Sequence, residues 1–154
     1  MKSSRDDILD LFDYAWQRFR DRMASLGDDE WSWQPTKDDR ISLRWRLWHI
    51  ADTLREERNG PWLGTVPELA AAHPEATGAA TALADVDDVD DAYAQWRGHL
   101  ASVSEASLSE RISPIAGPYG DDTRRSFALH TADELIHHAA EAALLRDLYA
   151  ARRR

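Results

Sequence analysis

Three titratable residues near the C-terminus are spaced so that they share one face of a helix. Residues 130–149 (HTADELIHHAAEAALLRDLY) are rich in Ala and Leu and contain no Gly or Pro, which predicts a helix. Glu134, His138 and Glu141 lie four, three and seven residues apart, and this spacing stacks their side chains along one face. Carboxylates and imidazoles placed in this way can form a hydrogen-bonded network or hold a divalent cation.

Large apolar residues occupy the same stripe of this helix. At about 100° per residue, Phe127, Leu145 and Leu148 all fall within about 40° of Glu134. We therefore expect the face to point into a core, where an unpaired carboxylate is costly and must be paired, protonated or bound to a cation. In one interpretation Glu134 accepts a hydrogen bond from His138 or pairs with a cation on another helix. In the other, the two side chains bind a divalent metal with a third ligand from elsewhere in the chain.

The candidate third ligand is His49, within RISLRWRLWHIAD (residues 40–52). This segment is apolar on nearly every side, which is typical of a deeply buried helix. The alternative for His49 is a neutral core histidine that donates to a backbone carbonyl. On a helical wheel His49 falls between Trp45 and the apolar stripe of the same helix.

Other polar residues near these three have more than one interpretation. His137 projects about 100° away from His138, so His138 is the preferred ligand because it keeps the four-residue spacing to Glu134. His130, one turn earlier, either supports the site or lies exposed at the helix start. Glu141 either orients a ligand or pairs with Arg146 or another Arg. Asp52 and Glu56 either support the metal ligands or are ordinary charges on a solvated helix face. Arg44, Arg46 and Arg55 either bind carboxylates of a thiol or substrate or form surface ion pairs. Trp45, Trp48 and Trp62 either line a pocket or pack in the core.

Composition narrows the class of protein. At 154 residues the chain fits one domain, residues 1–154. Its net charge of −9 argues against a nucleic-acid partner. The absence of Cys excludes disulfides, thiolate ligands and a protein-borne thiol nucleophile, and it fits a reducing cytoplasm. No apolar run is long enough for a bilayer and MKSSRDDILD is unlike a signal peptide, so we expect a cytoplasmic protein that does not bind membranes.

Helical periodicity and breakers predict an all-α four-helix bundle. The first helix is expected to begin at an N-cap, Ser4, and to close at Gly27, and the second is expected to stop at Asn59-Gly60-Pro61. The long connection 59–85 would let the second and third helices run parallel. The four helical stretches cover about 4–27, 41–58, 86–103 and 123–150.

These motifs resemble the DinB-like superfamily, which includes bacterial thiol-dependent S-transferases and mycothiol-dependent maleylpyruvate isomerase. The resemblance lies in SLRWRLWHIADTLREERNGPWLG (residues 42–64) and DELIHHAAEAALLRDLY (133–149), with WSWQP (31–35) as weaker support. It implies a bundle with a long crossover between helices two and three. It also implies a metal held by one His of the second helix and two residues four apart on the last helix. Here these are His49, Glu134 and His138, with Glu first as in the isomerase type.

Two imidazoles and one carboxylate leave open positions on a divalent ion, as catalytic sites do. Zn²⁺ is the default expectation, with Ni²⁺ or Fe²⁺ as alternatives. The resemblance implies transfer of a low-molecular-weight thiol of the mycothiol or bacillithiol class to a small electrophile, or thiol-assisted isomerisation. Because the chain lacks Cys, the thiol must be a cosubstrate. The alternatives are a non-enzymatic, stress-related metal-binding bundle and a structural bundle, such as a homodimer, with a buried Glu-His pair.

Overall fold

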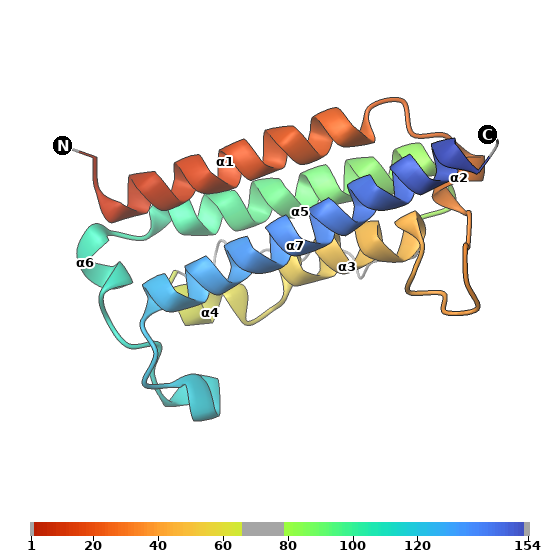
Figure 1. Ribbon diagram of the computed structural model, residues 1–154. Coiled ribbons are helices and arrows are strands. Elements are labelled where there is room, and N and C mark those ends of the chain that lie inside the picture. Colours follow the sequence, from red (N-terminus) through yellow and green to blue (C-terminus); the bar gives the residue numbers. More distant parts are fainter. Residues whose placement is uncertain (1, 66–78, 153–154) are drawn as a thin grey trace.

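Long helices dominate the computed structural model, which describes residues 2–65 and 79–152 (Figure 1). Within these ranges the chain forms helices and one isolated bridge, Arg111 to Thr123, but no strand. The all-α class expected from the sequence is therefore confirmed. The longest described helices are α1 (Ser4–Met23), α3 (Leu43–Arg55), α5 (Ala82–Ser102) and α7 (Arg124–Ala151).

Short helices connect the long ones. They are α2 (Asp28–Trp31), α4 (Asn59–Leu63), α6 (Glu105–Leu108) and the 3₁₀ helix η2 (Pro114–Tyr119). In Figure 1, α3 and α5 run in the same direction, while α1 and α7 run the opposite way. The connection after α4 includes residues 66–78, which lie outside the described residues. None of the helices in the described ranges has the length and apolarity needed to cross a bilayer.

One apolar face of each long helix builds the core. The buried residues recur at steps of three and four, so they stack on the side that meets the neighbouring helices. Trp96 is fully buried at the centre, with its ring 5.5 Å from Phe12 and 5.8 Å from Phe127. α1 contributes Ile8, Phe12, Ala15, Phe19 and Met23, and α5 contributes Val86, Val89, Tyr93, Trp96 and Leu100.

The ends of the first helix differ from the sequence expectation by a few residues. Ser3, not Ser4, is the N-cap, because its hydroxyl accepts from the backbone N–H of Asp6 and the Asp6 carboxylate accepts from the Ser3 N–H. The helix ends at Met23 rather than Gly27. Gly27 instead precedes α2 as its N-cap residue.

The second helix is shorter than expected, and the expected breaker starts a new helix. α3 ends at Arg55, and the Asn59 side-chain amide donates to the Thr53 carbonyl, one of the carbonyls left free at a helix end. The segment Asn59-Gly60-Pro61 then forms the first turn of α4. Proline is tolerated there because first-turn N–H groups need no helical partner. α4 contacts α7, where the ring of Trp62 lies 5.0 Å from that of Phe127.

A buried carboxylate ties α2 to α5. The Asp85 side chain accepts a hydrogen bond of 2.7 Å from the indole N–H of Trp31, and the residue is 3% exposed. Burial raises the pKa of Asp85 to about 6, although the Trp31 hydrogen bond opposes the shift. Because the folded protein holds this proton more tightly than the unfolded chain, Asp85 makes folding less favourable as pH rises from 4 toward 6.

We expect Asp85→Asn to remove this pH dependence. The amide oxygen keeps the Trp31 hydrogen bond but carries no charge. The wild type should therefore lose about 2–3 kcal/mol of unfolding free energy relative to the variant between pH 4 and pH 7. Urea unfolding at several pH values measures the difference. Asp87→Asn, an exposed change on the same helix, is the control. Parallel wild-type and Asp85→Asn curves would contradict the account.

Candidate metal centre

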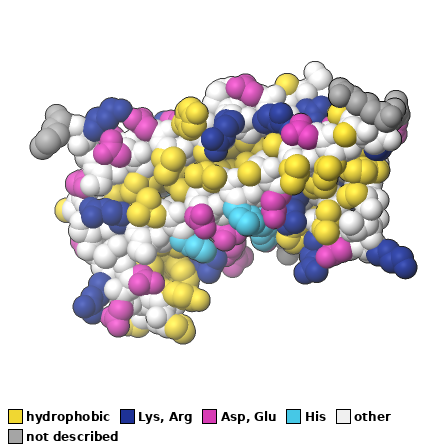
Figure 2. Space-filling view, viewed as in Figure 1, with side chains coloured by type: hydrophobic (Ala, Val, Ile, Leu, Met, Phe, Trp, Pro, Cys, Tyr) yellow, Lys and Arg dark blue, Asp and Glu magenta, His cyan; other side chains and the backbone are white. Residues whose placement is uncertain are grey.

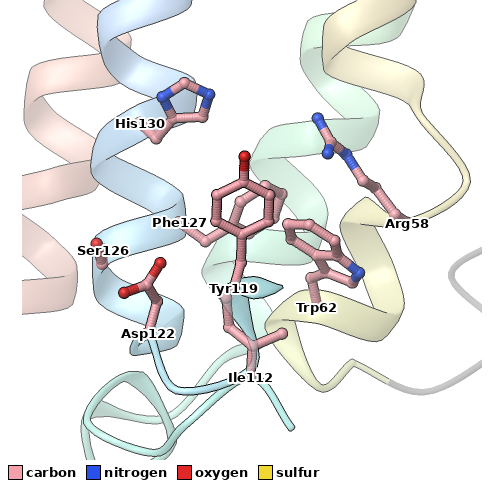
Figure 3. A pocket seen from close by; sticks show the side chains of 8 residues that line it. All are labelled: Arg58, Trp62, Ile112, Tyr119, Asp122, Ser126, Phe127 and His130. Carbon is pink, nitrogen blue, oxygen red and sulfur yellow. The ribbon is translucent and has the colours of Figure 1, made fainter. Parts of the chain in front are cut away.

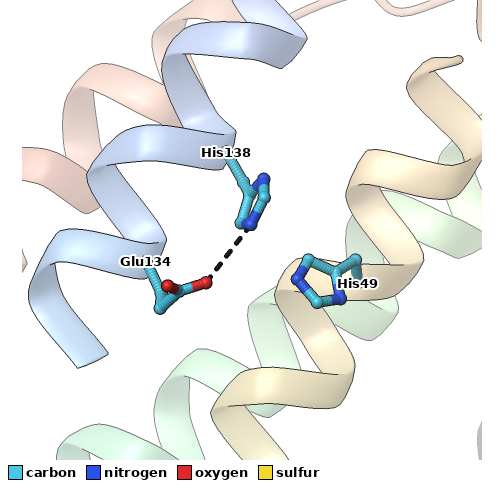
Figure 4. Close-up of side chains that lie close together, drawn as sticks. All are labelled: His49, Glu134 and His138. Carbon is cyan, nitrogen blue, oxygen red and sulfur yellow. Dashed lines mark ion pairs between the residues drawn. The ribbon is translucent and has the colours of Figure 1, made fainter. Parts of the chain in front are cut away.

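Side chains from two antiparallel helices converge midway along the bundle. His49 projects from α3, and Glu134 and His138 project from α7 toward it (Figure 4). One donor atom from each residue lies within 4.8 Å of the other two. The rings of His49 and His138 are 4.5 Å apart and nearly perpendicular. The structure thus brings together the three residues that the sequence singled out as ligand candidates.

The His138 ring is oriented by Glu141. Its Nδ1 lies 2.8 Å from Oε2 of Glu141, and the same carboxylate oxygen forms an ion pair with Arg46, whose Nε lies 3.1 Å away. Burial acts to raise the pKa of the Glu141 carboxyl, but the hydrogen bond with His138 and the charge of Arg46 together hold that pKa below its usual value. The ionised carboxylate can only accept, so Nδ1 of His138 donates.

This orientation leaves Nε2 of His138 facing Glu134. Nε2 lies 3.3 Å from Oε2 of Glu134. In a neutral imidazole whose Nδ1 carries the proton, Nε2 bears a lone pair. Two acceptors at this distance repel each other unless a proton or a metal ion lies between them. In the part of the chain that the structure describes, no Lys or Arg pairs with Glu134, so the compensating charge must come from within the cluster.

His49 is held by a neighbouring indole. Trp45 stacks on its ring at 4.7 Å with an interplanar angle of 18°. Burial lowers the pKa of His49 below its usual 6.5, the charge of His138 lowers it further, and Glu134 acts in the opposite direction. At neutral pH the His49 imidazole is therefore uncharged, which is the form that binds metals.

The cluster lies at the edge of the core rather than inside it. The Glu134 side chain is 33% exposed and that of His138 is 12% exposed. Phe127 and Leu145 are buried as expected, but Leu148, expected on the same buried stripe, is 47% exposed. Figure 2 shows histidine and acidic side chains together near the middle of this face. The stripe therefore borders the core at one end and solvent at the other.

A cavity of about 240 Å³ opens beside His49 and Glu134, which both line it. Such a space next to converging donor atoms is where a small ligand can reach them. Sequence reasoning did not assign Arg58, Thr53 or Thr131 to this site. Of these three, only Arg58 has a signal in the sequence, because it directly precedes the Asn59-Gly60-Pro61 break. The cavity is lined by His49, Thr53, Glu56, Arg58, Asn59, Phe127, His130, Thr131 and Glu134.

The remaining histidines take different positions. His137 is 61% exposed and lies 3.1 Å from Glu141, on the far side of that carboxylate. It forms a second, outer group of three donors with His138 and Glu141. His130 is exposed and lines the cavity. His99, to which no role was assigned, is buried and contacts the Thr65 hydroxyl at 2.9 Å.

The charged residues near the site are mostly paired elsewhere. Arg146 binds Glu30, so the cation on Glu141 is Arg46 from the facing helix rather than Arg146. Arg55 binds Asp88. Two of the arginines considered from sequence, Arg44 and Arg55, therefore lie outside the cluster: the Arg44 guanidinium lies over the Trp31 ring. Asp52 is exposed, and Trp48 is 37% exposed.

Comparison with known proteins identifies the family. The model of the DinB superfamily matches residues 11–142, and the chain belongs to this superfamily, as the sequence motifs predicted. Its members typically bind divalent metals. A similar solved structure is the crystal structure of the conserved protein of locus from Enterococcus faecalis. It is 19% identical, has a TM-score of 0.74, and the alignment covers 99% of this chain and 100% of that one, which shows a shared fold. No curated protein matches the sequence.

We expect the three side chains to be electrostatically coupled even without metal. In protein stripped with EDTA, NMR titration should give His49 a pKa below 6.5. His138→Gln should raise that pKa because it removes a repelling charge, and Glu134→Gln should lower it because it removes an attracting one. His130→Gln is the control and should leave it unchanged. Insensitivity of His49 to both α7 substitutions would contradict the observed geometry.

Proposed function

We propose that His49, Glu134 and His138 bind one divalent metal ion. The proposal is supported chiefly by the facing of Nε2 of His138 and the Glu134 carboxylate, which calls for a positive charge that no Lys or Arg of the described residues supplies. Glu141 fits the role of the carboxylate that commonly orients a metal-binding His through its other ring nitrogen. Two nitrogen donors and one oxygen donor suit Zn²⁺ first, and also Ni²⁺ or Fe²⁺.

We further propose that the protein is a thiol-dependent S-transferase or isomerase. A dication bound at a site with three protein ligands leaves positions open and favours the thiolate form of a thiol that reaches it. The chain has no Cys, so the sulfur comes from a low-molecular-weight cosubstrate of the mycothiol or bacillithiol class. In transfer, the thiol proton passes to solvent, the sulfur forms a bond to an electrophilic carbon, and the leaving group departs with its bonding electrons.

The chain's own residues would position the reactants. Glu141 and Arg46 fix the His138 ring from the side opposite the cavity. Trp45 covers one face of His49 and keeps water from that side of the ring. The cavity lined by Thr53, Asn59 and Thr131 leaves room for a small molecule beside the ligands. Binding two reactants side by side is itself a large part of the rate enhancement that such a site offers.

Metal content tests the ligand set. Untagged protein is expected to carry about one divalent ion per chain by elemental analysis. His49→Ala and His138→Ala should each weaken metal affinity more than about 100-fold, beyond the loss typical of supporting residues. His137→Ala is the matched control: it removes the adjacent, exposed imidazole and should leave metal content unchanged.

The control also separates the two groups of donor atoms. Loss of metal in His137→Ala but not in His49→Ala would place the ion at the outer group of His137, His138 and Glu141. Unchanged metal content in all three variants would refute the proposed site. A metal-free wild-type protein would favour the interpretation in which a shared proton joins Glu134 and His138.

Thiol consumption tests the activity. The metal-loaded protein is incubated with monobromobimane or a chlorinated aromatic and a series of bacterial thiols. We expect consumption of at least one thiol to fall to the uncatalysed rate in His138→Ala, because that change removes a ligand of the ion. Full metal loading without consumption of any thiol would instead support a non-enzymatic metal-binding protein.

A further inference from the structure

A second cavity adjoins the one beside the metal centre. Its volume is about 470 Å³. Arg58, Phe127 and His130 line both cavities, so the two spaces share a wall. A ligand that reaches the metal ligands through the inner cavity can therefore extend along these residues into the outer one. The outer cavity is completed by Trp62, Ile112, Tyr119, Asp122 and Ser126.

Aromatic rings form the walls of the outer cavity. Figure 3 shows Tyr119, Trp62 and Phe127 between His130 on one side and Arg58 on the other. The Trp62 ring lies 5.0 Å from Phe127 and 6.2 Å from Tyr119. Flat apolar surfaces of this kind bind planar apolar groups and add little strain or entropy cost.

Arg58 is held over these rings. Its guanidinium carbon lies 4.7 Å from the centre of the Trp62 ring and 6.0 Å from that of Phe127. Nε and Nη2 contact the Glu56 carboxylate. Nη1 makes no hydrogen bond to any residue in the ranges 2–65 and 79–152. Arg58 therefore presents unused N–H donors at the wall that the two cavities share.

The balance of charge depends on the metal. The inner cavity is lined by two carboxylates, Glu56 and Glu134, and by one guanidinium, that of Arg58, so it carries one net negative charge. A divalent cation on Glu134 changes this to one net positive charge and makes the cavity attractive to anions. Asp122 lines only the outer cavity. An anionic group is thus favoured at the Arg58 end and disfavoured at the Asp122 end.

We propose that the paired cavities bind a small organic acid with a planar apolar body. Its carboxylate accepts from Nη1 of Arg58, and its body lies against Trp62 and Tyr119. The inference rests on the proposed metal site, because the metal supplies the charge that favours an anion there. It makes Arg58 a determinant of substrate specificity: either the electrophile or the thiol carries the carboxylate.

Binding of a matched pair of probes tests this assignment. Zn²⁺-loaded protein, with its metal content first established by elemental analysis, is titrated calorimetrically with phenylacetate and with phenylacetamide. The acid should bind about tenfold more tightly than the amide, as expected for one charge-assisted hydrogen bond at a half-exposed site. Arg58→Gln should reduce that preference to within about twofold.

Two further variants complete the design. Arg40→Gln is the matched control, because Arg40 also pairs with a carboxylate two residues earlier, Asp38, but lines neither cavity. It should keep the tenfold preference. Trp62→Leu should weaken the acid and the amide equally, because both place the same ring against Trp62.

Equal binding of acid and amide by the wild type would overturn the inference. An acid preference that survives Arg58→Gln would also overturn it, because the carboxylate would then be bound by the metal or another group. Both outcomes leave the metal site intact. Absence of bound Zn²⁺ would appear in the elemental analysis before any probe is added. That result would refute the proposed function and the inference that depends on it.

The source of the carboxylate can be resolved with the same protein. Thiol consumption is compared for thiols with and without a carboxylate, and then for electrophiles with and without one. Sensitivity to Arg58→Gln in only one series assigns the acid to that reactant. Insensitivity in both series would overturn the assignment of Arg58 as a specificity determinant.

Discussion

Nε2 of His138 and a carboxylate oxygen of Glu134 face each other at 3.3 Å, and this contact calls for a proton or a cation between the two atoms. Glu141 contributes to this requirement, because it accepts the hydrogen bond from Nδ1 of His138 and so leaves Nε2 directed at Glu134. The hydrogen bond with His138 and the charge of Arg46 hold the pKa of Glu141 below its usual value. Arg46, Glu141, His138 and Glu134 thus contact one another in sequence across α3 and α7. This series of contacts ends at the point where a cation is needed.

The long helices make this arrangement rigid. α7 continues past the cluster in both directions, and its buried Phe127, Leu135 and Leu145 fix its rotation against the core. Leu47, Ile50 and Leu54 do the same for α3. His49, Glu134 and His138 lie on the same helices, beside these buried residues, so core packing sets their backbone positions. The side chains of His49 and Glu134 line the inner cavity. Membership of the DinB superfamily agrees with this use of the bundle.

Sequence reasoning located the cluster but not its surroundings. Helical spacing alone places Glu134 and His138 on one face, and the motifs around His49 resemble those of the family. Spacing within one helix does not, however, fix how two helices rotate against each other, so the pairing of Glu141 with Arg46 rather than Arg146 was not predictable. The outer cavity was also missed, because Ile112 and Tyr119 come from a connection whose path depends on tertiary contacts. The second helix ends at Arg55, before the expected stop at Asn59, and the expected breaker begins α4 because a proline in a first turn does not prevent a helix.

The candidate metal ligands and the aromatic residues of the outer cavity lie on different kinds of helix. The metal-ligand candidates lie on the long helices α3 and α7, whereas Trp62 lies on the short α4 and Tyr119 at the end of η2. A substitution of Trp62 or Tyr119 changes the wall of the outer cavity, while the ligand candidates stay in place on the long helices. Divergence of substrate preference within such a scaffold needs no redesign of the core. Two proteins with the same bundle and the same donor atoms can therefore serve quite different metabolic roles.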